Sequence, residues 1–226
     1  MRDNSPYAAP QSTVVSVHGE QAARVLRNTY MLLGMALAFS AACGWYSMSA
    51  GIGFINPILT LVVYIGLLIF TNVMRNSAAG ILGVFGITGW LGYTTGPLIA
   101  AYAAIPGGME LVTLALGSTA VVFVSLSAIA LVTRKDFSFM GQFLMVGIIV
   151  AFLGGLAAYF FNLPTLALAV SAAFVLLSSM LILWQTSAII HGGETNYIMA
   201  TVTLFVSIYN LFMSLLHIFT ALGGDD

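Results

Sequence analysis

Residues 137–193 read FSFMGQFLMVGIIVAFLGGLAAYFFNLPTLALAVSAAFVLLSSMLILWQTSAIIHGG, a run without one acidic or basic side chain apart from a histidine near its end. Asn162, Leu163 and Pro164 interrupt the run near its middle, where the fixed proline φ favours a turn. A bilayer core needs about 20 consecutive apolar residues per helix, so the run is long enough for two crossings. It therefore predicts two membrane helices, over residues 138–161 and 165–190.

Four more charge-free runs occupy most of the remaining chain, and each is long enough to cross a bilayer. The first is broken around Gly51 and Pro57, so it predicts two helices rather than one. The predicted fold class is an all-α integral membrane protein with seven transmembrane helices. The five further helices are expected over residues 28–50, 56–73, 78–103, 109–132 and 196–221.

The overall composition agrees with this fold class. Of the 226 residues, 60% are hydrophobic and only 6% are charged, whereas a soluble domain carries about 25% charged residues. The formal net charge is -1, which leaves no basic surface for phosphates, so no nucleic-acid partner is expected. The single cysteine, Cys43, excludes an intramolecular disulfide. The expected environment of the chain is the lipid bilayer.

Basic residues gather on one side of the predicted helices. Alternation of seven spans brings the N-terminal segment, the turn at Arg75 and the turn at Arg134 and Lys135 to the same side, and the opposite turns hold no Lys or Arg. The positive-inside rule then predicts that the N-terminus is cytoplasmic. With seven spans, the C-terminus lies on the other side of the membrane.

The two ends of the chain are expected to lie outside the membrane domain. Residues 1–27 are predicted to be a cytoplasmic, largely disordered tail, residues 28–221 the seven-helix domain, and residues 222–226 a short outer tail. The alternative for the N-terminal tail is a helix that rests on the membrane surface and contains Val14, Val17, Gln21 and Arg24.

The predicted helix over residues 78–103 carries glycines at spacings of three and four. Small residues let neighbouring backbones approach closely in a membrane, so one nearly side-chain-free stripe is expected here. Gly96 and Pro97 also predict a break or kink, because proline removes a backbone donor. The break is either a hinge or a packing kink satisfied by threonine hydroxyls. The stripe consists of Gly80, Gly83, Gly86, Gly89, Gly92 and Gly96.

The last predicted helix is unusually polar for a span that faces lipid. Amide and hydroxyl groups inside a membrane need partners, so this helix is expected in the interior of the bundle. Thr203, Tyr209 and Asn210 are predicted to form a central polar seam. Ser207 lies on the same helix, and Gln185 lies near the inner end of the helix before it.

A short polar turn with His191 and Glu194 precedes the last helix. One interpretation is a turn that binds a cation on the cytoplasmic side. The other is a plain turn with an acidic residue at the start of a helix. Two ligands are too few for a specific metal site, so no metal is expected.

Catalytic chemistry is not expected either. No His-Glu-x-x-His motif occurs, and Asp and Glu are missing from every predicted helix interior. The sequence therefore predicts a protein that is not an enzyme and binds no cofactor.

Residues 92–98, Gly-Tyr-Thr-Thr-Gly-Pro-Leu, and a pattern over the last two helices that includes Thr186 and Tyr197 carry a resemblance to a known family. They resemble the Bax inhibitor-1 family, also called the transmembrane Bax inhibitor motif family, and the resemblance runs over residues 28–221. It implies a seven-helix fold in which six helices surround the seventh.

Three further stretches are similar to the bacterial inner-membrane branch of this family: residues 25–30, 133–136 and 189–197. This resemblance implies a multi-pass protein of the bacterial inner membrane with a periplasmic C-terminus. It also implies association with, and restraint of, the membrane AAA protease FtsH and its HflK-HflC partners.

The chain departs from the family pattern at one pair of positions. Many members carry facing aspartates on the sixth and seventh helices, a pair proposed to sense pH and to gate a calcium leak. Here these positions hold Gln185 and Ser207. Neither side chain titrates near neutral pH, and neither offers the carboxylate oxygen that Ca²⁺ prefers.

Three hypotheses for the function follow. The leading one is a non-enzymatic membrane regulator that binds and modulates FtsH. The alternative is an ion channel or leak, for Ca²⁺ or H⁺, through the bundle around the seventh helix. A small-solute transporter is the third hypothesis, and only the Gly96-Pro97 break and the polar seventh helix favour it.

Overall fold

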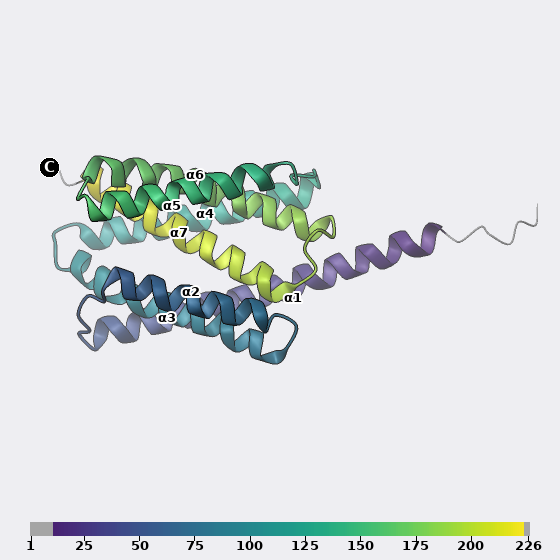
Figure 1. Ribbon diagram of the computed structural model, residues 1–226, viewed down its shortest axis with the longest axis horizontal. Helices are drawn as coiled ribbons and strands as arrows, with labels where there is room; N and C mark the ends of the chain where they lie inside the picture. Colours follow the sequence, from purple (N-terminus) through teal and green to yellow (C-terminus); the bar gives the residue numbers. More distant parts are fainter. Residues whose placement is uncertain (1–10, 224–226) are drawn as a thin grey trace, which may run out of the picture.

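The computed structural model describes residues 11–223 of the chain, with side chains described from residue 19 onward (Figure 1). Every regular element in this part is an α-helix, which confirms the predicted all-helical fold class. Six of the seven described helices begin and end within about three residues of the predicted bounds. The helices are α1 Gln11–Ser49, α2 Pro57–Val73, α3 Ala78–Ala103, α4 Gly108–Thr133, α5 Met140–Phe160, α6 Pro164–Ile190 and α7 Tyr197–Gly223.

The exception is α1, which is 39 residues long and begins at Gln11. Residues 11–27, for which the sequence left a disordered tail or a surface helix open, are helical in the structure, and residues 1–10 lie outside the described residues. A helix of this length spans about 58 Å, nearly twice the thickness of a hydrocarbon core of about 30 Å. The N-terminal part of α1 accordingly projects beyond the bundle (Figure 1).

The helices form two groups with α7 between them. In the first group α3 packs against α1 and α2, and in the second α6 packs against α4 and α5. α7 runs diagonally between the groups and packs against α1, α3, α4 and α6 (Figure 1). The outer positions belong to α2 and α5, which pack mainly on α3 and α6.

The largest cluster of buried apolar side chains lies where α7 meets the first group. Phe205 and Leu211 of α7, Ile87 of α3 and Leu33 of α1 belong to it, with Ile182 from α6. These side chains are at most 2% exposed. The core therefore includes α7, although this helix carries several polar residues, and the contacts fix α7 in its place.

The glycines of α3 do not form one stripe against one neighbour, as the sequence suggested. A Cβ at Gly83 or Gly86 would meet Thr71 or Leu67 of α2, so these glycines make room for α2. A Cβ at Gly92 would collide with the backbone oxygen of Ser40 in α1. The glycines thus divide between two faces, and α3 contacts α1 and α2 closely at once.

Pro97 does not break α3, which runs without interruption through this position. α3 is therefore not broken at Gly96 and Pro97, and a kink at this position stays a prediction. The hydroxyls of Thr94 and Thr95 donate to the carbonyl of Leu91, at 3.1 and 2.7 Å, and not to the carbonyl that lacks its donor at position 97. Gly96 lets α3 lie close to α1, because a Cβ there would lie 2.5 Å from the backbone oxygen of Gly44.

The connecting loops alternate between the two ends of the bundle. The α2–α3, α4–α5 and α6–α7 loops lie at the end from which α1 projects, and the other three loops lie at the opposite end (Figure 1). Arg75, Arg134 and Lys135 all belong to the first set of loops. We call this end the basic end and the other end the distal end.

Five of the described helices are long and apolar enough to cross a membrane: α1 from Gly19 onward, α4, α5, α6 and α7. α2 is apolar but has only 17 residues. α3 has 26 residues and is not among the five. Asn56 caps α2 by accepting a hydrogen bond from Ile58 N at 2.8 Å, and Pro57 occupies the first turn.

Candidate functional site

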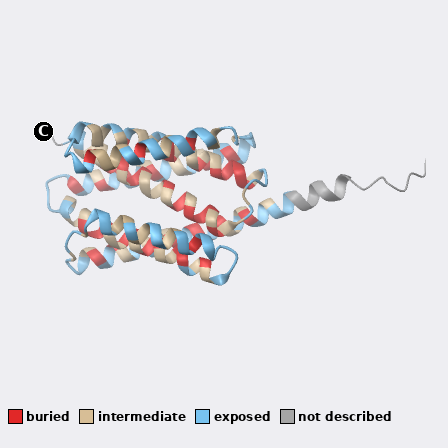
Figure 2. Ribbon diagram, viewed as in Figure 1, coloured by how far each residue is buried: buried red, intermediate tan, exposed pale blue. Residues whose placement is uncertain are grey.

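α7 is the helix best shielded from the surroundings. Every residue from Ile198 to Thr220 is buried or half-buried, whereas each of the other helices exposes part of its surface (Figure 2). Thr201 and Ser207 are fully buried. The polar residues of α7 therefore lie inside the protein, where they need protein partners.

Side-chain hydrogen bonds join α7 to helices of both groups. Each uses a hydroxyl or imidazole group, and polar groups at membrane depth need partners. These bonds hold α7 in one register against its neighbours. They join Thr201 Oγ1 to the backbone carbonyl of Thr29 in α1 (3.3 Å), Tyr209 Oη to Thr95 Oγ1 in α3 (3.2 Å), and His217 Nδ1 to Ser171 Oγ in α6 (2.7 Å).

Gln185 and Ser207 are both buried, at 2% and 0% exposure. The Ser207 hydroxyl donates to the carbonyl of Thr203, one turn earlier in α7, at 2.7 Å. The Gln185 side-chain nitrogen Nε2 has no protein partner. The two side chains are thus uncharged groups inside the bundle, and no hydrogen bond between them is found in the described part of the chain.

Of the three residues predicted to form a central polar seam, Tyr209 is hydrogen-bonded to Thr95. Thr203 and Asn210 are half-buried. A second inter-helix bond, which the sequence did not reveal, joins Tyr30 Oη of α1 to Thr186 Oγ1 of α6 at 3.2 Å. The partners lie 156 residues apart, so no local pattern could have identified them.

The α6–α7 loop connects the loops of the basic end. Asn196 Nδ2 donates to the carbonyl of Arg75 at 2.9 Å and to Asn76 Oδ1 at 3.0 Å, both in the α2–α3 loop. On the other side, Ser187 Oγ donates to the carbonyl of Lys135 in the α4–α5 loop at 3.0 Å. Asn196 thus connects the α6–α7 loop to the α2–α3 loop, and Ser187, near the end of α6, connects that helix to the α4–α5 loop. No pattern in the sequence predicted these contacts.

His191 and Glu194 serve this loop arrangement rather than forming a ligand pair. The ring nitrogens of His191 lie 2.9 Å from the carbonyl oxygen of Ser187 and 3.1 Å from that of Arg134. A carbonyl can only accept, so these nitrogens face acceptors and not a cation. Glu194 Oε1 accepts a hydrogen bond from Asn196 N at 2.8 Å. Among the described residues no three His, Cys, Asp or Glu side chains come together as metal ligands.

Asp136 lies in the α4–α5 loop at the basic end. The hydroxyl of Ser138, and then its backbone N–H at 2.8 Å, hold the pKa of Asp136 below its usual value. His191 adds a smaller attraction in the same direction. The carboxylate therefore stays ionised and fixes the start of the segment that leads into α5.

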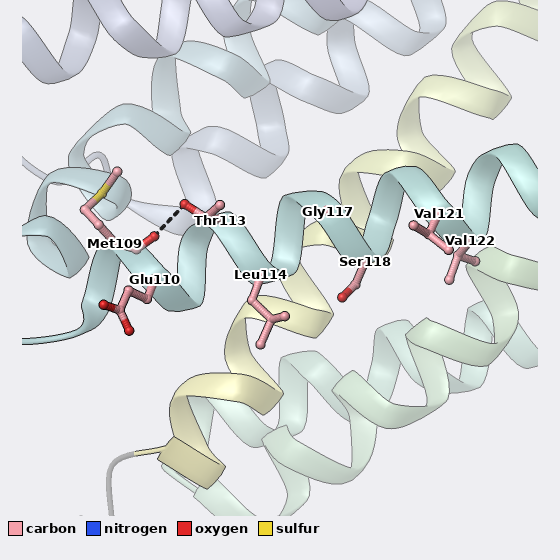
Figure 3. Close-up of a pocket in the computed structure, with 8 residues that line it drawn as sticks. All are labelled: Met109, Glu110, Thr113, Leu114, Gly117, Ser118, Val121 and Val122. Carbon is pink, nitrogen blue, oxygen red and sulfur yellow. Dashed lines mark hydrogen bonds between the residues drawn. The ribbon is translucent and has the colours of Figure 1, made fainter.

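Two cavities involve α4. A wide groove of about 920 Å³ runs along α4, lined by residues of that helix from Met109 to Val122 (Figure 3). Glu110 is the one charged side chain in its wall, and the Thr113 hydroxyl there donates to the carbonyl of Met109 at 2.8 Å. A narrower cavity of about 350 Å³ lies between α1, α3, α4 and α7. Neither cavity brings together a nucleophile and a base.

The exposed surface of the described helices is rich in Leu, Ile, Val and Phe, and five helices are long and apolar enough to cross a bilayer. An all-helical chain with a polar interior helix and such a surface is a multi-pass α-helical membrane protein. The comparison with protein families then gives its kind. The chain belongs to the Bax1-I family, described as inhibitor of apoptosis-promoting Bax1, whose model matches residues 22–224.

Similar proteins come from several bacteria. An uncharacterised protein of Pseudomonas aeruginosa is 50% identical over 202 residues, which cover 89% of this chain and 91% of that protein. The modulator of FtsH protease YccA of Escherichia coli strain K12 is 48% identical over 208 residues, or 92% of each chain. A protein of Escherichia coli O6:H1 with the same identity is named inner membrane protein YccA.

Proposed function

We propose that this chain is a non-enzymatic regulator of the bacterial inner membrane that binds and modulates an FtsH-type membrane protease, with the HflK-HflC complex as a further partner. The observation that carries the proposal is the 48% identity over 92% of the chain to a protein named modulator of FtsH protease. Among the described residues, no group of catalytic side chains points to an enzymatic activity.

The membrane arrangement belongs to the same proposal. All seven helices cross the bilayer, with α7 as the central helix, the basic end in the cytoplasm and the C-terminus in the periplasm. The grouping of Arg75, Arg134 and Lys135 at one end supports this orientation. The lengths of α2 and α3, 17 and 26 residues, are compatible with a span when the helix packs against others.

The projecting part of α1 is the segment that meets the protease in this proposal. Val25 is the first α1 side chain in the core, beside Ile189 of α6 and Ala200 of α7. The described part of α1 before Val25 begins at Gln11 and extends past the basic end (Figure 1), which in this proposal faces the protease. The closely packed bundle behind them resists extraction, so the protein occupies the protease and is destroyed only slowly.

Copurification from native membranes in mild detergent tests the proposal. The tagged full-length chain is expected to bring down FtsH, and a variant that lacks residues 3–18 is expected to lose most of it and to live longer in cells that contain the protease. Arg24 and Arg27 remain in this variant, so insertion should be unchanged. Absence of FtsH from the full-length pull-down, or equal lifetimes of the two chains, contradicts the proposal.

The second candidate is an ion leak around α7. Gln185 Nε2, Thr29 Oγ1 and Ser127 Oγ are buried without a protein partner, and such groups commonly bind internal water. Flux of Ca²⁺ or H⁺ into proteoliposomes that contain only this chain would favour the leak. Without carboxylates at positions 185 and 207, we propose that the flux is small.

A further inference from the structure

The cavity of about 350 Å³ lies in the half of the bundle toward the distal end. Trp45 and Met48 near the end of α1 line it, together with Met109 at the start of α4. Its inner end reaches Leu37 of α1 and Phe205 of α7. Along α4 it extends from Met109 to Thr119, a rise of about 15 Å, or about half the thickness of a hydrocarbon core.

The walls of this cavity offer a ligand little besides apolar contact. Thr95 Oγ1 is already bonded to the carbonyl of Leu91 at 2.7 Å and to Tyr209 Oη at 3.2 Å. Thr119 Oγ1 donates to the carbonyl of Ala115 at 2.7 Å. Because these hydroxyls have partners within the protein, the cavity suits an apolar ligand and not a polar or charged one.

The cavity opens sideways, toward the surroundings of the bundle. α1 and α4 each pack against α3 and α7 but do not form a packed pair with each other in the described structure. The side chains at the opening are exposed: Trp45 at 68%, Leu116 at 52% and Met109 at 46%. In a membrane protein such a surface meets lipid, so the opening faces acyl chains.

The position of the opening decides what can enter. All four walls are helices of the bundle itself, and the small side chain of Ala41 leaves space on the α1 side. An occupant must enter between α1 and α4, the side that meets lipid acyl chains in a bilayer.

We propose that this cavity is a lipid-binding site that holds one acyl chain of a membrane phospholipid from the leaflet at the distal end. The chain enters between α1 and α4 and fills the space beside Phe205 and Tyr209. The head group lies beside Trp45, a residue type that favours the membrane interface. Because α1 and α4 both pack against α7, a bound acyl chain stabilises the position of α7. The proposal is separate from protease binding and requires only that the helices lie in a bilayer.

Cavity-filling variants test the site with matched controls on the same helix. Ala41 and the adjacent Ala42 are both exposed, but only Ala41 lines the cavity. The full-length protein and the A41L and A42L variants are reconstituted in vesicles of phosphatidylethanolamine and phosphatidylglycerol. After extraction in mild detergent, native mass spectrometry counts the phospholipids that remain bound.

A second pair on α4 keeps the test valid if A41L fails to fold. Leu116 lines the opening and Leu114 does not, although their exposures are 52% and 53%. The wild type, A42L and L114W are expected to retain one phospholipid. A41L and L116W are expected to retain it at least about tenfold less, which corresponds to about 1.4 kcal/mol.

Three results would overturn the proposal. The first is equal lipid retention by all five proteins, and the second is equal loss in the lining variants and their controls. The third is a wild type that holds no lipid and forms a dimer through this face, which would assign the cavity to a second copy of the chain.

Discussion

Gly92 of α3 lies against the backbone of Ser40 in α1, and a Cβ at this position would collide with the Ser40 carbonyl oxygen. Backbone atoms cannot move aside as the end of a flexible side chain can, so α1 and α3 would have to separate. We predict that G92A lowers the free energy of unfolding by about 1–3 kcal/mol, the usual cost of overfilling a packed core. Thermal unfolding in detergent measures it.

Gly117 of α4 is the control for this substitution, since a Cβ there would meet nothing within 4 Å. G117A should leave stability unchanged or raise it slightly, because alanine favours a helix more than glycine does. Equal midpoints for G92A and the wild type would show that the close approach of α1 and α3 does not depend on this glycine.

Gln185 and Ser207 give a second prediction at the scale of residues. Both are buried and neutral, so the wild type should show little Ca²⁺ flux and little dependence of flux on pH between 6 and 8. The double variant Q185D/S207D places two carboxylates in the interior, where mutual repulsion raises one pKa and makes the protein respond to pH or to cations. Flux into proteoliposomes is the measurement.

Each buried carboxylate costs about 3 kcal/mol at membrane depth, so the amount of folded double variant must be matched to the wild type. A wild-type leak as strong as that of the double variant would show that these two positions do not form the gate.

At the scale of elements, the α6–α7 loop depends on Asn196. Its side chain caps α7 by accepting a hydrogen bond from Met199 N at 3.0 Å, and it also donates to the α2–α3 loop. N196A should lose both roles and about 1–2 kcal/mol of stability. N196S keeps a capping hydroxyl but is too short for the second role, so its stability should lie between N196A and the wild type.

Thr195, the exposed neighbour of Asn196, is the site of the control variant T195A. Equal stability of N196S and N196A in thermal unfolding would mean that the cap contributes nothing. Equal stability of all these variants and the wild type would mean that the loop connection does not stabilise the fold.

Sequence patterns identified most elements because the physical constraint is local. A membrane helix must be free of charge over about 20 residues, and charge-free runs predicted α3 over residues 78–103, as observed. For residues 11–27 the sequence left a disordered tail and a surface helix open, because polarity marks the end of a membrane-buried segment but not the end of a helix. At Pro97 it predicted a break or kink, whereas α3 is unbroken there and lies close to α1.

The candidate site was only partly predictable for a related reason. The polarity of α7 predicted an interior position for this helix, and in the structure every residue from Ile198 to Thr220 is buried or half-buried. The partners of its polar groups lie in other helices. Tyr209 and Thr95 are 114 residues apart, and Asn196 and Arg75 are 121 apart. Such pairs depend on how the helices assemble, which no spacing within one helix reveals.

For the whole molecule, orientation in the membrane gives a further prediction. Ser77 and Ser138 lie in loops of the basic end, and Ala104 follows α3 at the distal end. In cells with a permeabilised outer membrane, an impermeant thiol reagent should label A104C and spare S77C and S138C, all in a C43A background. Ala104 is preferred to Gly107, whose φ of 72° would strain a cysteine. Labelling of S77C would overturn the proposed orientation.

Restraint of the protease is the central claim, and reconstitution tests it most directly. Purified FtsH-type protease and a membrane-anchored substrate are placed in proteoliposomes with and without this chain, and the rate of substrate loss is followed while an internal dye reports Ca²⁺ entry. The account predicts that the chain slows degradation in proportion to its amount and that Ca²⁺ entry stays at the level of protein-free vesicles. An unchanged rate of degradation together with rapid Ca²⁺ entry would contradict it and would establish the ion leak instead.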